Sequence, residues 1–218
     1  MSIAEKTLLL KDDIDKIYEA GYNKAEKQNY LYYAYTCDSL FYKAVFPENS
    51  DIVIRFKKAP TGYNLFMGST QNTKTVTLIS EDNSNNIKFD QSFRSNTSIE
   101  ILDLTEFNCS FSSINYCFLG ASNIREIKGE LDFSNCTGAS QWTGGASNLQ
   151  ELRIKPNSIQ IEISVTQATK LSHDSLMSIL NGLAVIETTK TLWLGTTNLN
   201  KLTDEEKAIA TEKGWSLA

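Results

Sequence analysis

The stretch Asn148-Leu149-Gln150-Glu151-Leu152-Arg153-Ile154 repeats, with substitutions, two earlier stretches, Ser98-Ile99-Glu100-Ile101-Leu102-Asp103-Leu104 and Asn123-Ile124-Arg125-Glu126-Ile127-Lys128. Equivalent apolar residues recur every 25 positions, in the series Ile99, Ile124, Leu149 and in the series Leu102, Ile127, Leu152. A fixed step of about 20 to 50 residues is typical of a solenoid, whose units bury their apolar edges against their neighbours. The repeated motif therefore predicts a solenoid.

Apolar residues alternate with polar ones inside each copy of the motif, and this pattern favours a short strand with one buried face. Strands from successive copies would pair in parallel, and their apolar side chains would form one buried column. The predicted column consists of Ile99, Leu102, Leu104, Ile124, Ile127, Leu149, Leu152 and Ile154. The alternative is chance similarity within an ordinary mixed fold.

Other positions extend the repeat beyond the strands. An aromatic residue precedes each copy, and an Asn-Cys pair follows two of them, at Phe93, Phe118, Trp142, Asn108-Cys109 and Asn135-Cys136. With substitutions, these positions fit the leucine-rich repeat pattern. We expect the aromatic residues to lie between successive coils and the cysteines to fill small apolar spaces. We expect the asparagines to be buried and to bind the backbone where the chain leaves the strand.

The predicted fold class is α/β: a leucine-rich repeat solenoid with short parallel strands, irregular coils, an N-terminal helix and a C-terminal helical cap. Residues 1–30 form a helical segment with one apolar face, made of Ile14, Ile17, Tyr18, Gly21, Tyr22 and Ala25. That face either docks on the repeats or packs against other chains as an attachment or oligomerisation segment. Residues 31–65 are rich in aromatics, contain a predicted strand at Asp51–Phe56 and form a candidate N-terminal cap.

The repeats occupy residues 66–170, and residues 171–218 form a C-terminal capping module with two helices. Ser172 is the expected N-cap of the first helix, and Thr203 with Glu206 forms a capping box at the second. Gly214 ends the second helix in a left-handed conformation. A strand at Thr191–Leu194 lies between the helices, and Trp215 folds back over the last coil.

Composition sets limits on the function. The chain has 218 residues, 41% of them hydrophobic and 22% charged, with a formal net charge of -5. No basic run exceeds Lys57-Lys58, so we expect no nucleic-acid partner. No apolar run is long enough to span a membrane, and the first residues do not match a signal peptide.

The sequence contains no recognisable catalytic, cofactor-binding or metal-binding pattern, so we expect no enzymatic activity. The four cysteines lack metal-ligand spacing and are expected to be reduced and buried. His173, the single histidine, is expected to be solvated at a helix N-terminus. Trp142, Trp193 and Trp215 are expected in the core rather than as ligand platforms.

The closing segments Leu171–Leu183, Thr191–Gly195 and Lys201–Ala218 resemble the C-terminus shared by many leucine-rich repeat proteins of bacteriophages and prophages of gut bacteria. The runs Phe89–Arg94, Ser113–Phe118 and Gly129–Cys136, and the leading run Ile14–Tyr22, resemble the same group. The repeats are also similar to the irregular, BspA-like leucine-rich repeats of bacterial surface adhesins.

This resemblance implies a virion component of the tail, the baseplate or a head fibre, held by its N-terminal helix and displaying its repeats. Implied partners are other virion proteins, further copies of the chain in a guessed trimer, and a host-surface glycan or protein. Expected ligand-contact positions are the loop residues Asn83, Asn85, Gln141 and Trp142. The alternative is a bacterial interaction or adhesion module without catalytic activity.

Overall fold

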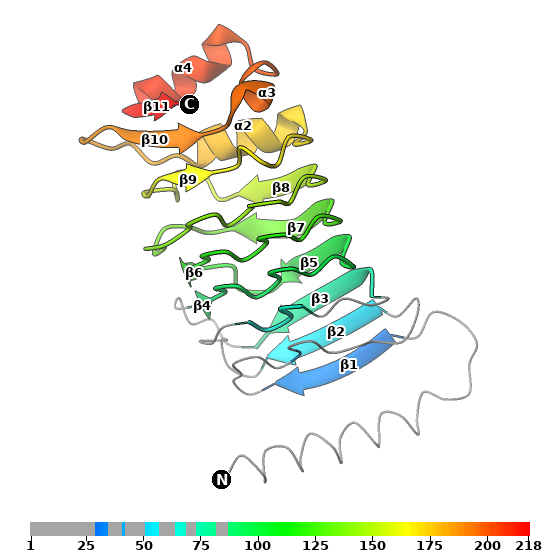
Figure 1. Ribbon diagram of the computed structural model, residues 1–218. Coiled ribbons are helices and arrows are strands. Elements are labelled where there is room, and N and C mark those ends of the chain that lie inside the picture. Colours follow the sequence, from blue (N-terminus) through cyan, green and yellow to red (C-terminus); the bar gives the residue numbers. More distant parts are fainter. Residues whose placement is uncertain (1–28, 35–40, 42–50, 57–63, 69–72, 82–86) are drawn as a thin grey trace.

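The computed structural model describes residues 29–34, 41, 51–56, 64–68, 73–81 and 87–218 (Figure 1). The largest sheet has six strands in the order β1-β2-β3-β5-β7-β8, and each neighbouring pair is parallel. Its strands are β1 Asn29–Ala34, β2 Asp51–Phe56, β3 Thr75–Ser80, β5 Ile101–Glu106, β7 Glu126–Leu131 and β8 Glu151–Ile154. The predicted α/β class with parallel strands is confirmed, as is the strand at Asp51–Phe56.

Equivalent residues of successive strands lie side by side in this sheet. Val76 pairs with Ile52 on one side and with Leu102 on the other, and Leu102 pairs with Ile127. The side chains of these four residues are at most 2% exposed. The eight residues of the predicted column, Ile99, Leu102, Leu104, Ile124, Ile127, Leu149, Leu152 and Ile154, are at most 3% exposed.

The step between turns is uneven, and an irregularity in β7 is one of the places where it changes. The register between β7 and β8 shifts between Glu126 and Glu130. Gly129 lies inside this shift with φ +97°, and a Cβ there would lie 2.7 Å from the backbone oxygen of Leu104. The added residues of the bulge therefore need a glycine, both for the left-handed backbone and for the close approach of the preceding turn.

Aromatic rings form a stacked column inside the turns. The ring centroids of Phe41 and Phe66 lie 5.1 Å apart, those of Phe66 and Phe93 5.0 Å, and those of Phe93 and Phe118 5.5 Å, with ring planes within 18° of parallel. These distances are close to the roughly 4.8 Å between hydrogen-bonded strands. Trp142 continues the column edge-on to Phe118. The expectation that Phe93, Phe118 and Trp142 lie between coils is confirmed.

A second set of short parallel strands lies on another side of the stack, to the left in Figure 1. There β4 pairs with β6, and β10 lies between β9 and β11. The bounds are β4 Ile87–Lys88, β6 Phe111–Ser113, β9 Ile163–Ser164, β10 Lys190–Trp193 and β11 Trp215–Leu217. Hydrogen bonds between equivalent backbone groups, such as Phe93 N to Cys117 O and Phe118 N to Trp142 O, connect the turns between these strands.

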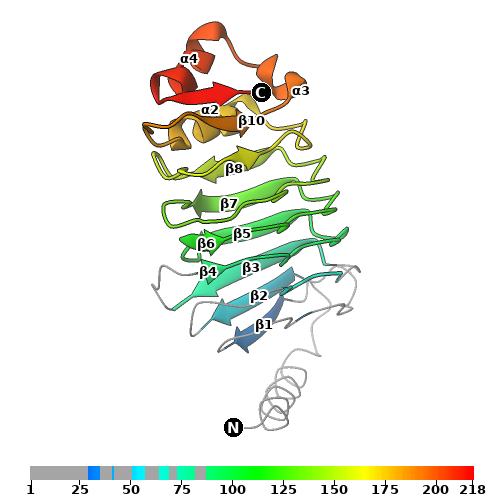
Figure 2. The same ribbon diagram turned by 60° about the vertical axis from the view of Figure 1, so that its left-hand side comes forward.

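The C-terminal module contains α2 His173–Gly182, the short α3 Thr196–Leu199 and α4 Asp204–Glu212 (Figure 2). Ser172 caps α2, and Thr203 and Glu206 form the capping box of α4. Gly214 has φ +87°. The predicted caps, the left-handed glycine and the strand before α4 are confirmed. The sequence analysis missed α3, which is too short to give a periodic pattern.

Helix α2 lies beside β8, where a further strand of the large sheet would come (Figure 1). The backbone N–H of Leu152 donates to Ser175 Oγ at 3.0 Å, and that of Ile154 donates to Ser178 Oγ at 2.9 Å. Ser175 Oγ in turn donates to the backbone oxygen of Gln150. Serine hydroxyls of a helix therefore satisfy the edge of the sheet that a next strand would otherwise cover.

The prediction that the asparagines after the strands are buried is wrong, but Asn108 does bind the backbone as expected, by accepting from the N–H of Ser110. Asn135 is exposed and Asn108 is only partly buried. The buried asparagines of the described residues are Asn96 and Asn198. Asn96 Oδ1 accepts from the backbone N–H groups of Ser98 and Ile99, just before β5. The corners after the strands need no buried amide because short polar side chains there bind their own turn.

The cysteines Cys109 and Cys136 are buried as predicted.

Replacing Ser175 with Ala should destabilise the protein by roughly 1 to 3 kcal/mol, because the buried N–H of Leu152 loses its acceptor and the carbonyl of Gln150 keeps only the N–H of Ser172 as a donor. Urea unfolding followed by circular dichroism measures this difference. The control is Ser147→Ala, at an exposed position where the change should stay within about 0.5 kcal/mol. Equal midpoints for the two variants would contradict the edge-closing role of Ser175.

Candidate functional site

The outward face of the large sheet is polar and charged. Side chains alternate along its strands, as in β2 and β5, where buried residues alternate with partly exposed ones. The outward residues form rows across the turns because their strands are in register. They are Asp51, Thr75, Ile101, Glu126 and Glu151 in one row and Val53, Thr77, Asp103 and Lys128 in the next, so each row is polar apart from one aliphatic residue. The described helices lie at the C-terminal end of the stack and leave this face uncovered by any of them (Figures 1 and 2).

An ion-pair row borders this face at the start of the strands. Glu100 Oε1 lies 2.9 Å from Lys74 Nζ, and Glu100 Oε2 lies 2.6 Å from Arg125 Nη2. The three residues come from three successive turns, joined by backbone hydrogen bonds from Ile101 to Lys74 and from Glu126 to Glu100. The hydrogen bond from Lys74 is the main cause of the lowered pKa of Glu100. Such partly exposed pairs contribute at most about 1 kcal/mol.

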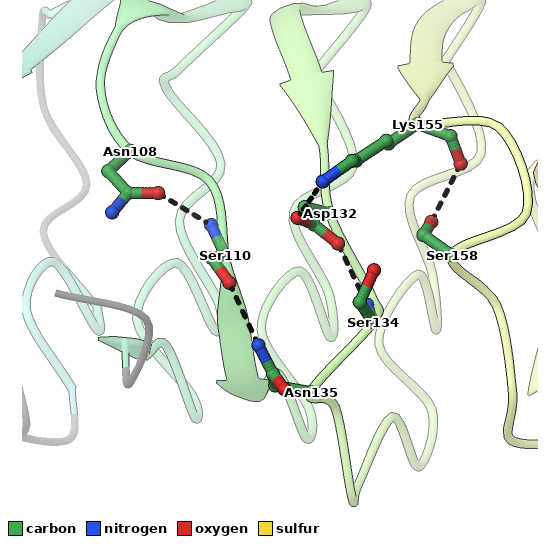
Figure 3. Close-up of polar contacts among 7 residues, drawn as sticks. All are labelled: Asn108, Ser110, Asp132, Ser134, Asn135, Lys155 and Ser158. Atoms are coloured by element: carbon green, nitrogen blue, oxygen red, sulfur yellow. Dashed lines mark hydrogen bonds and ion pairs between the residues drawn. The ribbon is translucent and has the colours of Figure 1, made fainter. Parts of the chain in front are cut away.

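A second polar row lies where the strands end (Figure 3). Asp132 Oδ1 accepts from the backbone N–H of Ser134 at 2.8 Å, and Asp132 Oδ2 lies 2.7 Å from Lys155 Nζ of the next turn. Burial raises the pKa of the Asp132 carboxyl, but the hydrogen bonds from Lys155 and Ser134 outweigh that effect and the net shift is downward. The carboxylate therefore stays ionised and paired, which suits a structural role and not proton transfer.

The preceding turn uses an uncharged version of the same corner. Asn108 Oδ1 accepts from the backbone N–H of Ser110, and Ser110 Oγ accepts from Asn135 Nδ2 at 3.4 Å (Figure 3). Ser158 Oγ donates to the backbone oxygen of Lys155 in the following turn. The contacts of Asn108 and Ser158 lie within one turn, whereas the contact of Asn135 with Ser110 joins two successive turns. The residues of this row stabilise the corners of the turns, and they include no pair of free carboxylates for acid–base chemistry.

The side of the stack that carries the short strands has a different, largely neutral chemistry, apart from the buried carboxylate of Asp90, which accepts from Ser113 Oγ and from the Asn115 N–H. Thr137 Oγ1 donates to the backbone oxygen of Ser112, and the Ser140 N–H donates to Asn115 Oδ1 at 2.9 Å. Both contacts join residues 25 positions apart, so they repeat the step of the turns. Gly138 lies against the Asn115 amide, where a Cβ would come within 2.6 Å of Nδ2. Hydroxyl and amide groups thus line this side.

Trp193 projects from the neutral side, at β10. Its side chain is 45% exposed, whereas Trp142 and Trp215 are 0% and 2% exposed. The expectation of three core tryptophans is therefore right for Trp142 and Trp215 and wrong for Trp193. Alternation in β10 was the signal that was overlooked, because buried Leu192 and Leu194 flank Trp193 and force it to the opposite face.

The structure brings together only part of the set of residues that the sequence singled out. The eight residues of the buried column pack inside the turns and cannot reach a ligand. Of the expected ligand-contact positions, Gln141 is exposed, but Trp142 is fully buried and that prediction is wrong. Trp142 is buried because it ends the aromatic column against Phe118 and Phe133. The other predicted positions, Asn83, Asn85, Ile14, Ile17, Tyr18, Gly21, Tyr22 and Ala25, lie outside the described residues.

The reactive side chains of the described residues are occupied or inert. The thiols of Cys109, Cys117 and Cys136 are free and buried, and Cys37 lies outside the described part. Burial raises the pKa of Cys109 to about 12 and that of Cys136 to about 11, so both remain protonated at neutral pH. His173 Nε2 lies 2.8 Å from Glu206 Oε1 and links α2 to α4.

Within the described ranges, no group of three or more His, Cys, Asp or Glu side chains is arranged to hold a metal ion. None of the described helices is long and apolar enough to cross a membrane. Comparison of the chain with protein-family models, with curated proteins and with solved structures found no match.

Replacing Asp132 with Asn should lower stability by about 1 kcal/mol at neutral pH, because the pair with Lys155 is lost. The folded-state pKa of Asp132 is lowered, so its contribution is complete above the unfolded pKa of about 3.9 and disappears as the pH falls through the folded value. The difference from the wild type should therefore shrink on acidification. Urea unfolding at a series of pH values measures it.

The control for this pH series is Glu187→Gln, which removes an exposed carboxyl with no hydrogen bond or ion pair to a described residue. Its unfolding midpoint should follow that of the wild type at every pH. A constant difference between Asp132→Asn and the wild type down to strongly acidic pH would show that the carboxylate charge does not contribute.

Proposed function

We propose that the chain is a leucine-rich repeat solenoid that displays two exposed faces for binding and has no catalytic role. The observation that carries this proposal is the register of the large sheet, in which Ile52, Val76, Leu102 and Ile127 occupy one buried row. One strand per turn, a buried column and a hydrogen-bonded helical end are the features expected of a solenoid. Irregular steps such as the one at Gly129 fit the irregular type of leucine-rich repeat.

A stack of turns suits display because the register that aligns the buried residues also aligns the outward side chains of successive strands in rows. The charged face and the neutral face each repeat across several turns, so a long ligand can make many weak contacts at once. No described residues form a nucleophile–base pair or a metal site that would favour an enzyme instead. Binding is the activity that this arrangement serves best.

The setting that we propose for this display is a bacteriophage particle. The support is the resemblance of residues 171–218 and of the repeats to phage and prophage leucine-rich repeat proteins. The chain would be a structural protein of the tail, the baseplate or a head fibre, held to other virion proteins by residues 1–30. Copies would lie together, a trimer being the starting hypothesis, and the repeats would face a host-surface glycan or protein.

This function predicts that the protein is recovered with purified phage particles. Mass spectrometry of particles purified by density gradient should detect its peptides at a constant ratio to the capsid protein. Immunogold labelling with an antibody against the repeats should then locate it at the tail, the baseplate or the head.

The control is the same gradient fraction from a culture of the host without phage. Enrichment in bacterial envelope fractions, with no peptides in the particles, would exclude the virion role and favour the bacterial interaction or adhesion module.

A further inference from the structure

Trp193 is a large aromatic side chain that the fold holds on the surface. Leu192 and Leu194, its neighbours along β10, are both 0% exposed, so the strand fixes the indole on the outer side. Backbone pairing with β9 and β11 holds the strand itself, and Val165 N donates to the oxygen of Trp193. Trp193 and Val185 are the exposed large hydrophobic residues of the described ranges. A ring kept rigid and exposed in this way is suited to contact a ligand.

Hydroxyl-bearing residues lie on the same face of the β9–β10–β11 sheet as Trp193. Ser164 is the register partner of Trp193, and its hydroxyl lies 3.2 Å from that of Thr166. Thr191, two residues before Trp193, lies on the same side of β10, and its hydroxyl is 3.0 Å from that of Ser216 on β11. These groups are partly exposed. They offer both donors and acceptors beside the indole.

One carboxylate lies at the border of this group. Glu162 Oε1 accepts from the backbone N–H of Thr191 at 2.9 Å, and its Oε2 has no partner among the described residues. Lys190, the nearest cation along β10, binds the backbone oxygen of Gln160. The two charges are opposite in sign, so the surroundings of Trp193 have no net charge from these side chains. Glu162 Oε2 can therefore accept a hydrogen bond from a hydroxyl group of a ligand.

The size of the patch selects its occupant. A stable protein interface buries on the order of 1,000 Å² or more and needs several apolar anchors. Here a single indole lies among hydroxyls, and Val185 belongs to the loop after α2 rather than to this sheet. A pyranose ring has the complementary form, because its C–H groups make one apolar face that stacks on the electron-rich indole while its hydroxyls point outward to polar partners.

We infer that the Trp193 face, with Ser164, Thr191 and Glu162, is a subsite for one ring of a neutral saccharide. This inference deepens the proposed display function and rests on it, because it assigns the host-surface contact to one place and one class of ligand. The indole supplies the stacking surface, and Glu162 and the hydroxyls select sugar hydroxyl groups. Because Glu162 and Lys190 offset each other, the subsite has no net charge with which to attract an anionic glycan.

The protein itself offers a specific probe of this site. Trp193 is the exposed one of the three tryptophans of the chain, so acrylamide quenching of tryptophan fluorescence reports mainly on it. Soluble oligosaccharides of glucose, galactose, mannose and N-acetylglucosamine are the ligands to test, with oligogalacturonate as the anionic comparison. At least one neutral oligosaccharide should protect the full chain from quenching in a saturable manner, and oligogalacturonate should not.

Variants at position 193 distinguish the loss of a stacking contact from a loss of folded protein. Trp193→Ala should lower the affinity, measured by calorimetry, about tenfold or more, and Trp193→Phe should lower it less because a smaller aromatic face remains. Val185→Ala, at the other exposed apolar residue, should leave the affinity unchanged. Circular dichroism and the unfolding midpoint should match the wild type in all three variants, since both positions are on the surface.

The inference is overturned if no neutral oligosaccharide protects Trp193, if only the anionic one binds, or if Trp193→Ala binds as well as Val185→Ala. None of these results depends on whether the protein is found in phage particles. Loss of the virion assignment with intact saccharide binding at Trp193 would reject the proposed setting and keep the subsite.

Discussion

The distance between hydrogen-bonded parallel strands is the constraint on which the rest of the fold depends. At roughly 4.8 Å it brings equivalent side chains of successive turns into contact, so every inward position must be compatible with a copy of itself. Aliphatic residues meet this condition in the row from Ile52 to Ile127, and phenyl rings meet it by lying parallel from Phe41 to Phe118. This condition explains why similar apolar residues recur every 25 positions in the sequence.

The same constraint creates the problem of how the stack ends. A further turn would always find a strand edge to join, so the last edge needs a different partner. Ser175 and Ser178 of α2 supply that partner because a helix can present hydroxyls at i and i+3 to alternate N–H groups of a strand. The helix also buries Leu176 and Ile179, so it closes the apolar column together with the backbone edge.

These two requirements explain which parts of the structure could be predicted from the sequence. Inward positions, aromatic layers and helix caps follow local rules, so the buried column and the caps at Ser172 and Thr203 were predictable. The edge-closing role of Ser175 was not, since it depends on a contact with Leu152, 23 residues earlier. The buried asparagine was placed wrongly because exposed corners can use short polar side chains, as Asp132 and Asn108 do.

The candidate site was harder to predict for a related reason. The stacking constraint fixes the type of the inward side chains, whereas the outward rows differ in chemistry from face to face, from the ion pairs of Glu100 to the neutral contact of Thr137. Trp142 ends the aromatic column and is buried, whereas Trp193 is held outward because it stands between buried Leu192 and Leu194 in β10. In a stacked fold, a large apolar residue that faces outward has no role in the interior packing to explain it. In this chain the sequence sign of the exposed position is the alternation Leu192-Trp193-Leu194, in which the tryptophan takes the outward place.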